Sequence, residues 1–144
     1  MSNNYEKIVI AVDGSKASEK AFKKSVEIAK ADNATLILAH IVDTRTFATA
    51  EAYDKSLSER AEKYARDLMN EYVENAKEAG VEDVELVIKY GSPKVAIAKE
   101  IAPEKDADLI IVGATGLNAV ERFLIGSVSE SVARYAKCDV LIVR

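Results

Sequence analysis

The sequence predicts an α/β protein, a single doubly wound domain in which helices cover both faces of a five-stranded parallel sheet. Short runs rich in Val, Ile and Leu, typical of strands, recur at residues 8–12, 35–42, 84–90, 109–112 and 140–143. Most of these runs are almost continuously apolar, which indicates strands buried on both faces. Segments with helical spacing separate them, and this alternation favours parallel strands with right-handed crossovers. The 144 residues, 49% of them hydrophobic, fit one domain over residues 1–144.

The first two expected helices lie at about residues 15–31 and 57–80, and both carry an apolar stripe. The residues expected to face the sheet are Phe22, Val26 and Ala29 in the first helix, and Ala61, Leu68, Tyr72 and Ala79 in the second. Ser56 and Glu59 form a capping-box pattern ahead of the second helix. Gly80 stands where a left-handed C-terminal cap is expected.

The third and fourth expected helices are shorter. Ser92 is the expected N-cap of the third, Pro93 takes its first helical position, and Pro103 is expected to stop it. The fourth covers about residues 127–136. The inward-facing residues are predicted to be Val95, Ala98 and Ile101 or Ala102 in the third helix, and Val128, Val132 and Ala136 in the fourth.

Composition excludes several classes of function. The net charge is -4 with both signs interspersed, so no basic field is available to bind nucleic acid. The apolar runs are far shorter than the roughly 20 residues of a membrane span, so no membrane partner is expected. Cys138 is the only cysteine, and the first residues lack the pattern of a signal peptide. Both observations favour a cytoplasmic location.

Polar residues and glycines follow two of the expected strands. Asp13 follows the first strand, and a loop rich in glycine and serine, with Gly113, Gly116, Gly126, Ser127 and Ser129, follows the fourth. Ligands of doubly wound sheets bind at the carboxyl ends of strands near the switch point, which strands one and four commonly flank. Glycines let backbone N–H groups approach a phosphate, and a helix N-terminus attracts its charge. These residues predict a nucleotide site.

Each of these features also has a purely structural interpretation. The glycines could serve only to shape a loop, and Ser127 with Glu130 matches a capping box. Asp13 could bind a ribose or a metal ion, or it could cap the first helix, as Ser15 also could. The sole histidine, His40, and Cys138 are predicted to be structural and unreactive. The run Phe123-Leu124-Ile125 is predicted to pack beneath the loop.

The spacing of Gly113, Gly116, Gly126 and Ser127 resembles the nucleotide-binding pattern of the universal stress protein family, in its ATP-binding branch. Further equivalents are Val12-Asp13-Gly14-Ser15, His40-Ile41-Val42-Asp43, Gly91-Ser92-Pro93, Ala107-Asp108-Leu109-Ile110-Ile111-Val112-Gly113 and Cys138-Asp139-Val140-Leu141-Ile142-Val143. The resemblance covers the whole chain. It implies a sheet ordered 3-2-1-4-5, a homodimer paired along the fifth strand, and ATP with Mg or Mn as the ligand.

The resemblance also implies roles for individual residues. Asp13 would contact the ribose and lie near the metal, Ile41 would meet the adenine through its backbone, and Val112 and Gly113 would line the nucleotide. Ala11, Val12 and Ser15 would complete that part of the site, and Gly116, Gly126, Ser127, Val128 and Ser129 would bind the phosphates. Ala114 and Thr115 depart from the family pattern, because many members have a basic residue here.

The expected function is therefore a regulatory or stress-response role with slow or no ATP hydrolysis. Two alternatives stay open: a nucleotide-dependent enzyme of adenylyl or phosphoryl transfer, and a dimeric interaction protein that binds no nucleotide. The chain has neither the Walker lysine motif nor Gly-x-Gly-x-x-Gly after its first strand. Their absence counts against two common classes of nucleotide enzyme.

Overall fold

The computed structural model describes residues 4–43, 55–114 and 126–144. The elements in chain order are β1 (Lys7–Ala11), α1 (Lys16–Asp32), β2 (Thr35–Asp43), α2 (Lys55–Ala79), β3 (Val84–Gly91), α3 (Pro93–Ala96), the π-helical turn η2 (Ile97–Ile101), α4 (Ala102–Glu104), β4 (Leu109–Gly113), α5 (Ser127–Tyr135) and β5 (Asp139–Val143). Each expected strand is present, with its ends displaced by at most a single residue. The α/β fold class is confirmed.

The strands form one parallel sheet in the order β3-β2-β1-β4-β5, as predicted. In β1, Ile8 is paired with Leu36 of β2 on one side and with Leu109 of β4 on the other. Along the chain, β2 and β3 are added on one side of β1, and β4 and β5 are then added on its other side. The switch point therefore lies between β1 and β4, where a doubly wound sheet binds its ligands.

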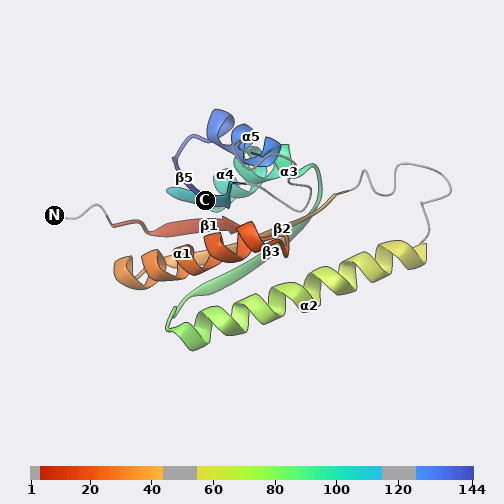
Figure 1. Cartoon of the computed structure of the whole chain (residues 1–144), viewed down its shortest axis with the longest axis horizontal. Helices are drawn as coiled ribbons and strands as arrows, with labels where there is room; N and C mark the ends of the chain where they lie inside the picture. The colour runs from red at the N-terminus through yellow and green to blue at the C-terminus, as the bar shows by residue number, and fades with distance from the viewer. Residues whose placement is uncertain (1–3, 44–54, 115–125) are drawn as a thin grey trace.

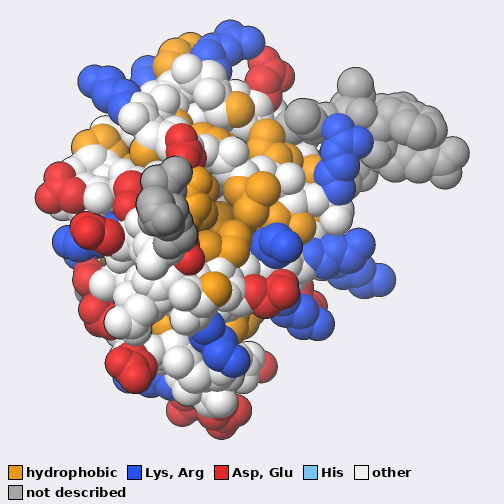
Figure 2. All heavy atoms as spheres, turned by 90° about the vertical axis from the view of Figure 1, so that its left-hand side faces the viewer, with side chains coloured by type: hydrophobic (Ala, Val, Ile, Leu, Met, Phe, Trp, Pro, Cys, Tyr) orange, Lys and Arg blue, Asp and Glu red, His pale blue; other side chains and the backbone are white. Residues whose placement is uncertain are grey.

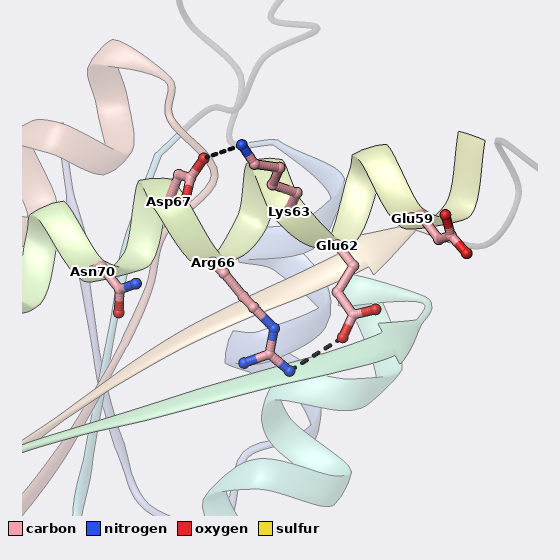
Figure 3. Close-up of a pocket in the computed structure, with 6 residues that line it drawn as sticks. All are labelled: Glu59, Glu62, Lys63, Arg66, Asp67 and Asn70. Atoms are coloured by element: carbon pink, nitrogen blue, oxygen red, sulfur yellow. Dashed lines mark hydrogen bonds and ion pairs between the residues drawn. The ribbon is translucent and has the colours of Figure 1, made fainter. Parts of the chain in front are cut away.

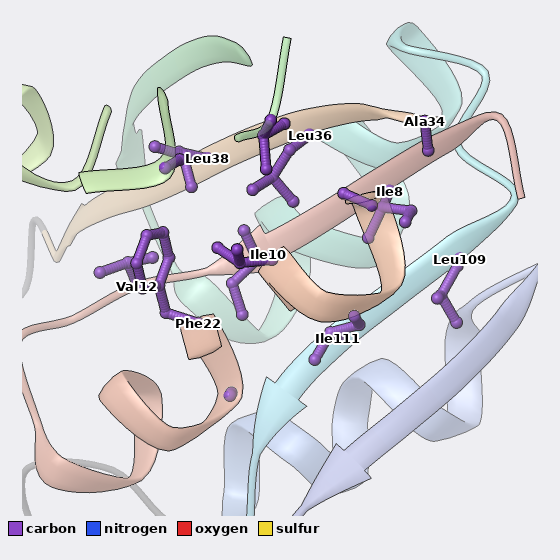
Figure 4. Close-up of a cluster of buried hydrophobic side chains, with 14 of the residues drawn as sticks. Ile8, Ile10, Val12, Phe22, Ala34, Leu36, Leu38, Leu109 and Ile111 are labelled. Atoms are coloured by element: carbon purple, nitrogen blue, oxygen red, sulfur yellow. The ribbon is translucent and has the colours of Figure 1, made fainter. Parts of the chain in front are cut away.

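Helices cover both faces of the sheet (Figure 1). Alternate residues of β1 point to opposite faces, because side chains in a strand have a period of two. Ile8 and Ile10 are fully buried beneath the α1 and α2 side, together with Leu36, Leu38 and Ile111 (Figure 4). Val9 lies in the other core cluster, with residues of η2 and α5. Two separate cores thus hold β1 in the centre of the molecule.

The inward face of α1 agrees with the sequence pattern, whereas that of α2 agrees only in part. Phe22, Val26 and Ala29 are buried as expected, but the buried residues of α2 are Ala65, Met69 and Ala76. The expected inward residues Leu68 and Tyr72 are only half-buried, Ala61 is likewise half-buried, and Ala79 is exposed. Small and flexible side chains fit closest to the sheet. Which side of this amphipathic helix does so depends on its packing against β2, β3 and α1.

Two predicted signals in α2 have different outcomes. Ser56 lies inside the helix, which already includes Lys55, so the predicted capping box ahead of the helix is wrong. Gly80 does end the helix, with φ at +111° and Val81 N donating to Ala76 O at 3.1 Å. Glycine reaches this left-handed conformation without the steric cost that a Cβ would add.

The helical segment after β3 continues past the predicted stop. Ser92 is its N-cap and Pro93 its first residue, as expected, but Pro103 lies within the last turn, which ends at Glu104. A regular α-helix would place the Pro103 ring against the carbonyl four residues earlier. The π-helical turn just before it, with Ala102 N donating to Ile97 O, widens the helix there.

This π-helical turn also explains a wrong inward assignment. Ala98, Ile101 and Ala102 are buried as expected, but Val95 is 44% exposed, and Ala96 and Ile97 are buried in its place. A π-helical turn contains one residue more than an α-helical turn. Residues before it are therefore rotated about the helix axis, away from the positions that a regular helix would give them. In α5, Val132 is buried, and Val128 and Ala136 are half-buried, in agreement with the predicted face.

Candidate functional site

The loop after β1 is built around the carboxylate of Asp13. Asp13 Oδ1 accepts from Ser15 N at 2.8 Å, and Asp13 N donates to Ser18 Oγ at 3.3 Å. Gly14 turns the chain between them with φ at +83°. No donor from the described part of the chain hydrogen-bonds to Asp13 Oδ2. The loop thus holds a carboxylate at the switch point with one oxygen available to a ligand.

Of the two candidate caps of α1, Ser15 performs the capping. Its side chain accepts from Ser18 N at 3.1 Å, and its backbone conformation is extended, as an N-cap requires. Asp13 instead stabilises the turn before the helix, because its Oδ1 accepts from Ser15 N. Ser18 is a residue that the sequence analysis missed, and the Ser-x-x-Ser spacing that begins at Ser15 was the available signal.

The first residues of α5 contradict the capping box of Ser127 and Glu130, which was the structural alternative for these residues. Gly126 is the N-cap, with φ -64° and ψ 159°, and Ser127 is already the first helical residue and exposed. The first bond within the helix runs from Glu130 N to Gly126 O at 3.0 Å. The N–H groups of Ser127, Val128 and Ser129 come before this first helical bond in the chain. Gly126, the N-cap, has no side chain that could accept from them. These amides and the helix dipole together favour an anion.

A pair of serine substitutions tests these two helix starts. We expect Ser15→Ala to lower the free energy of unfolding by about 1 kcal/mol, because it removes the cap of α1. Ser127→Ala is the matched control, and we expect it to change stability by less than about 0.5 kcal/mol, since Ser127 is exposed and caps no N–H group among the described residues. Urea denaturation of both variants measures the difference. Equal losses would contradict the assignment of the caps.

Two hydrogen bonds tie α5 to the end of β4. The buried Ser129 hydroxyl donates to Gly113 O at 2.5 Å, and Gly126 N donates to Ala114 O at 2.6 Å. The Ser129 hydroxyl is therefore engaged with the end of β4. Gly116, which was predicted to bind phosphate, and Thr115, which departs from the family pattern, lie outside the described residues.

Gly113 is placed where β4 passes closest to α1. A Cβ on Gly113 would lie 2.8 Å from both the carbonyl carbon and the oxygen of Ala17, closer than real Cβ contacts. The approach brings the end of β4 against the first turn of α1, directly after the Asp13 loop. The predicted residues of the first and fourth strand ends are therefore neighbours, and Gly113 has a packing role of its own.

The remaining predicted site residues lie in the strands or, for Val12, directly after β1. Val12 and Val112 are each 2% exposed, while Ala11 and Ile41 are half-buried. Val12 N donates to Ala39 O at 2.9 Å, which continues the pairing of β1 with β2. Val12 belongs to the core cluster on the α1 and α2 side, whereas Val112, Ala11 and Ile41 belong to the cluster on the other face of the sheet.

His40 and Cys138 have the structural roles expected of them. His40 Nδ1 donates to Val12 O at 2.7 Å, so the imidazole spans the ends of β2 and β1. Burial, with smaller contributions from Asp139 and Asp108, raises the pKa of the half-buried Cys138 thiol. A thiol with a raised pKa is less reactive at neutral pH. The run at residues 123–125 lies outside the described residues.

A shallow hollow on α2 is separate from the strand-end site. Its lining residues are Glu59, Glu62, Lys63, Arg66, Asp67 and Asn70, all from this one helix (Figure 3). Arg66 Nη2 pairs with Glu62 Oε1 at 3.1 Å, and Lys63 Nζ pairs with Asp67 Oδ2 at 3.9 Å. Exposed pairs of this kind contribute little stability. The hollow is a solvated face of the helix.

The described residues contain neither a membrane-spanning helix nor a cluster of metal ligands. None of the described helices is long and apolar enough to cross a membrane. Within the same ranges, no cluster of three or more His, Cys, Asp or Glu side chains could hold a metal ion. Asp13 therefore stands as a single carboxylate.

Comparison with known proteins agrees with this strand order. The family pattern of the universal stress proteins matches residues 4–144. The chain belongs to the universal stress protein family. A Staphylococcus aureus (strain USA300) protein that bears this family name is 50% identical over 140 residues, which cover 97% of this chain and 84% of the relative.

Solved universal stress proteins share the fold over nearly the whole chain. UspA from Lactobacillus plantarum is 32% identical with a TM-score of 0.88, covering 99% of this chain and 100% of its own. A universal stress protein crystallised in complex with cAMP is 35% identical with a TM-score of 0.72, covering 99% of this chain and 98% of its own. The order 3-2-1-4-5 found in this universal stress protein matches these structural neighbours.

Proposed function

We propose that this universal stress protein binds ATP at the carboxyl ends of β1 and β4 and serves a cytoplasmic regulatory or stress-response role. The observation that carries the proposal is the N-terminus of α5, which no side chain among the described residues caps and which hydrogen bonds tie to the end of β4. The loop with Asp13 stands next to it, across the contact of Gly113 with Ala17. The relative in complex with cAMP supports an adenine nucleotide as the ligand.

The proposed ligand fits the chemistry of the two loops. The phosphates would bind Gly116, Gly126, Ser127, Val128 and Ser129, and the adenosine would meet Ala11, Val12, Asp13, Ser15, Ile41, Val112 and Gly113. Asp13 would also hold Mg or Mn. One carboxylate is sufficient for a magnesium ion that is bound mainly through phosphate oxygens and water. The metal would thus enter with the nucleotide.

We propose that hydrolysis is slow or absent. Phosphoryl transfer requires charge clamps on the phosphates and an oriented nucleophile. Asp13 is the one charged side chain among the proposed site residues, and the others offer backbone amides, hydroxyls and apolar surface. Backbone amides stabilise the charge of the bound phosphates. They add no cation that would stabilise the transition state of hydrolysis. A binding and signalling role fits this chemistry better than turnover.

We also propose that two copies pair along β5, the edge strand beside β4. Its apolar residues Val140, Leu141, Ile142 and Val143 are half-buried in the single chain. Figure 2 shows hydrophobic side chains gathered near the centre of one face, with charged side chains around them. An edge strand of this composition can pair with a second copy. Native mass spectrometry of the gently purified protein measures both the dimer and any retained nucleotide.

Calorimetry with ATP and magnesium tests the nucleotide proposal. We expect saturable binding to the wild type, and an affinity about tenfold or more lower for Asp13→Asn, because a charged hydrogen-bond acceptor and metal ligand is lost. Asp139→Asn is the matched control, since it removes the same charge at the start of β5 and should bind as the wild type does. Absence of saturable heat with the wild type would refute the proposal.

A further inference from the structure

Tyr64 of α2 lies beside the Asp13 loop. A Cβ on Gly14 would lie 3.4 Å from Tyr64 Oη, the nearest atom to it. The side chain is nevertheless 61% exposed, the highest value among the large hydrophobic residues described as exposed. In the described part of the chain, the Tyr64 hydroxyl has no hydrogen-bond partner. A polar group is thus held at the edge of the proposed site without a structural bond.

The position of Tyr64 is set by the residues that follow it along α2. Tyr64, Leu68 and Tyr72 are spaced four apart and share one side of the helix. Leu68 Cδ2 lies 3.7 Å from the point that a Cβ on Gly14 would occupy. The Tyr72 ring packs edge-on against Phe22 of α1, with ring centroids 4.7 Å apart. These contacts anchor the helix to α1 and to the Asp13 loop. The backbone of α2 at Tyr64 is thereby placed close enough for the Tyr64 hydroxyl to reach the Asp13 loop.

We propose that the Tyr64 hydroxyl donates a hydrogen bond to the ribose of the bound nucleotide, next to the acceptor oxygen of Asp13. This inference rests on the proposed function, which places the ribose at Asp13. Gly14 follows Asp13 directly, so the hydroxyl and the carboxylate border the same turn of the chain. A sugar hydroxyl both donates and accepts, and a carboxylate together with a phenol matches those two needs.

The experiment combines a substitution with altered nucleotides. The affinities of the wild type and Tyr64→Phe are measured by calorimetry for ATP, 2′-deoxy-ATP and 3′-deoxy-ATP. We expect Tyr64→Phe to bind ATP about fivefold more weakly, as is typical for the net loss of one hydrogen bond. For the deoxy analogue that lacks the contacted hydroxyl, the two proteins should bind equally. The melting temperature without nucleotide should stay unchanged, because the ring is retained.

Tyr135→Phe is the matched control, a tyrosine 46% exposed at the last residue of α5, and it should bind ATP as the wild type does. The inference is overturned if Tyr64→Phe binds ATP with wild-type affinity. Equal weakening of ATP and both deoxy analogues would also overturn it, since the hydroxyl would then act elsewhere than on the sugar. A wild type that does not bind ATP would reject the proposed function itself, and this inference with it.

Discussion

Replacing Gly113 by alanine is expected to lower the free energy of unfolding by about 3 kcal/mol, the upper part of the range for overpacking a core. The new Cβ would lie 2.8 Å from the backbone carbonyl carbon and oxygen of Ala17, which cannot rotate away as a side chain can. β4 and α1 would have to separate at the centre of the fold. For a chain of this size the melting temperature should fall by roughly 10 °C. Thermal and urea denaturation measure both quantities.

A second substitution identifies the cause of this loss. Ala17→Gly removes the Ala17 Cβ, which lies 3.0 Å from the added atom, but it leaves the closer carbonyl group in place. We therefore expect Ala17→Gly to restore little stability to the Gly113→Ala protein. Full rescue would mean that the side chain, and not the backbone, sets the distance between β4 and α1. Wild-type stability of Gly113→Ala itself would disprove the close approach.

Gly126→Asp is expected to weaken ATP binding by at least about a hundredfold while leaving the protein folded. Gly126 is the N-cap of α5 with φ -64° and ψ 159°, a conformation open to any residue, so no backbone strain requires glycine there. Aspartate is a better cap than glycine and favours the positive end of the helix dipole. Its charge would stand where the phosphates are proposed to bind, and repulsion over a few ångströms costs several kcal/mol.

Gly126→Ser separates charge from capping in this experiment. Serine caps the helix without a negative charge, so we expect it to reduce ATP affinity much less than aspartate does. Circular dichroism and melting temperatures of both variants without nucleotide should match or exceed those of the wild type. If Gly126→Asp bound ATP with unchanged affinity, the phosphates would not lie at the start of α5.

Much of the site could be predicted because its signals are local. Asp13 directly follows a strand-like run, and Gly126 with Ser127 directly precedes a helical one, so adjacent residues identify both strand ends. The role of each residue was harder to predict. Ser127 with Glu130 matches a capping box, yet the helix starts one residue too early for Ser127 to cap it. Such a shift depends on the bonds that anchor Gly126 and Ser129 to the end of β4.

The sequence by itself determined the strands and their order along the chain, because apolar runs and helical spacing are written in neighbouring residues. The order of strands in space entered through the resemblance to a family. Only the tertiary structure decided which face of α2 is buried, that Gly113 lies against Ala17, and that Tyr64 stands beside Gly14. These contacts join residues far apart in the chain, and their distances depend on how whole helices pack on the sheet. No local pattern of residues specifies that packing.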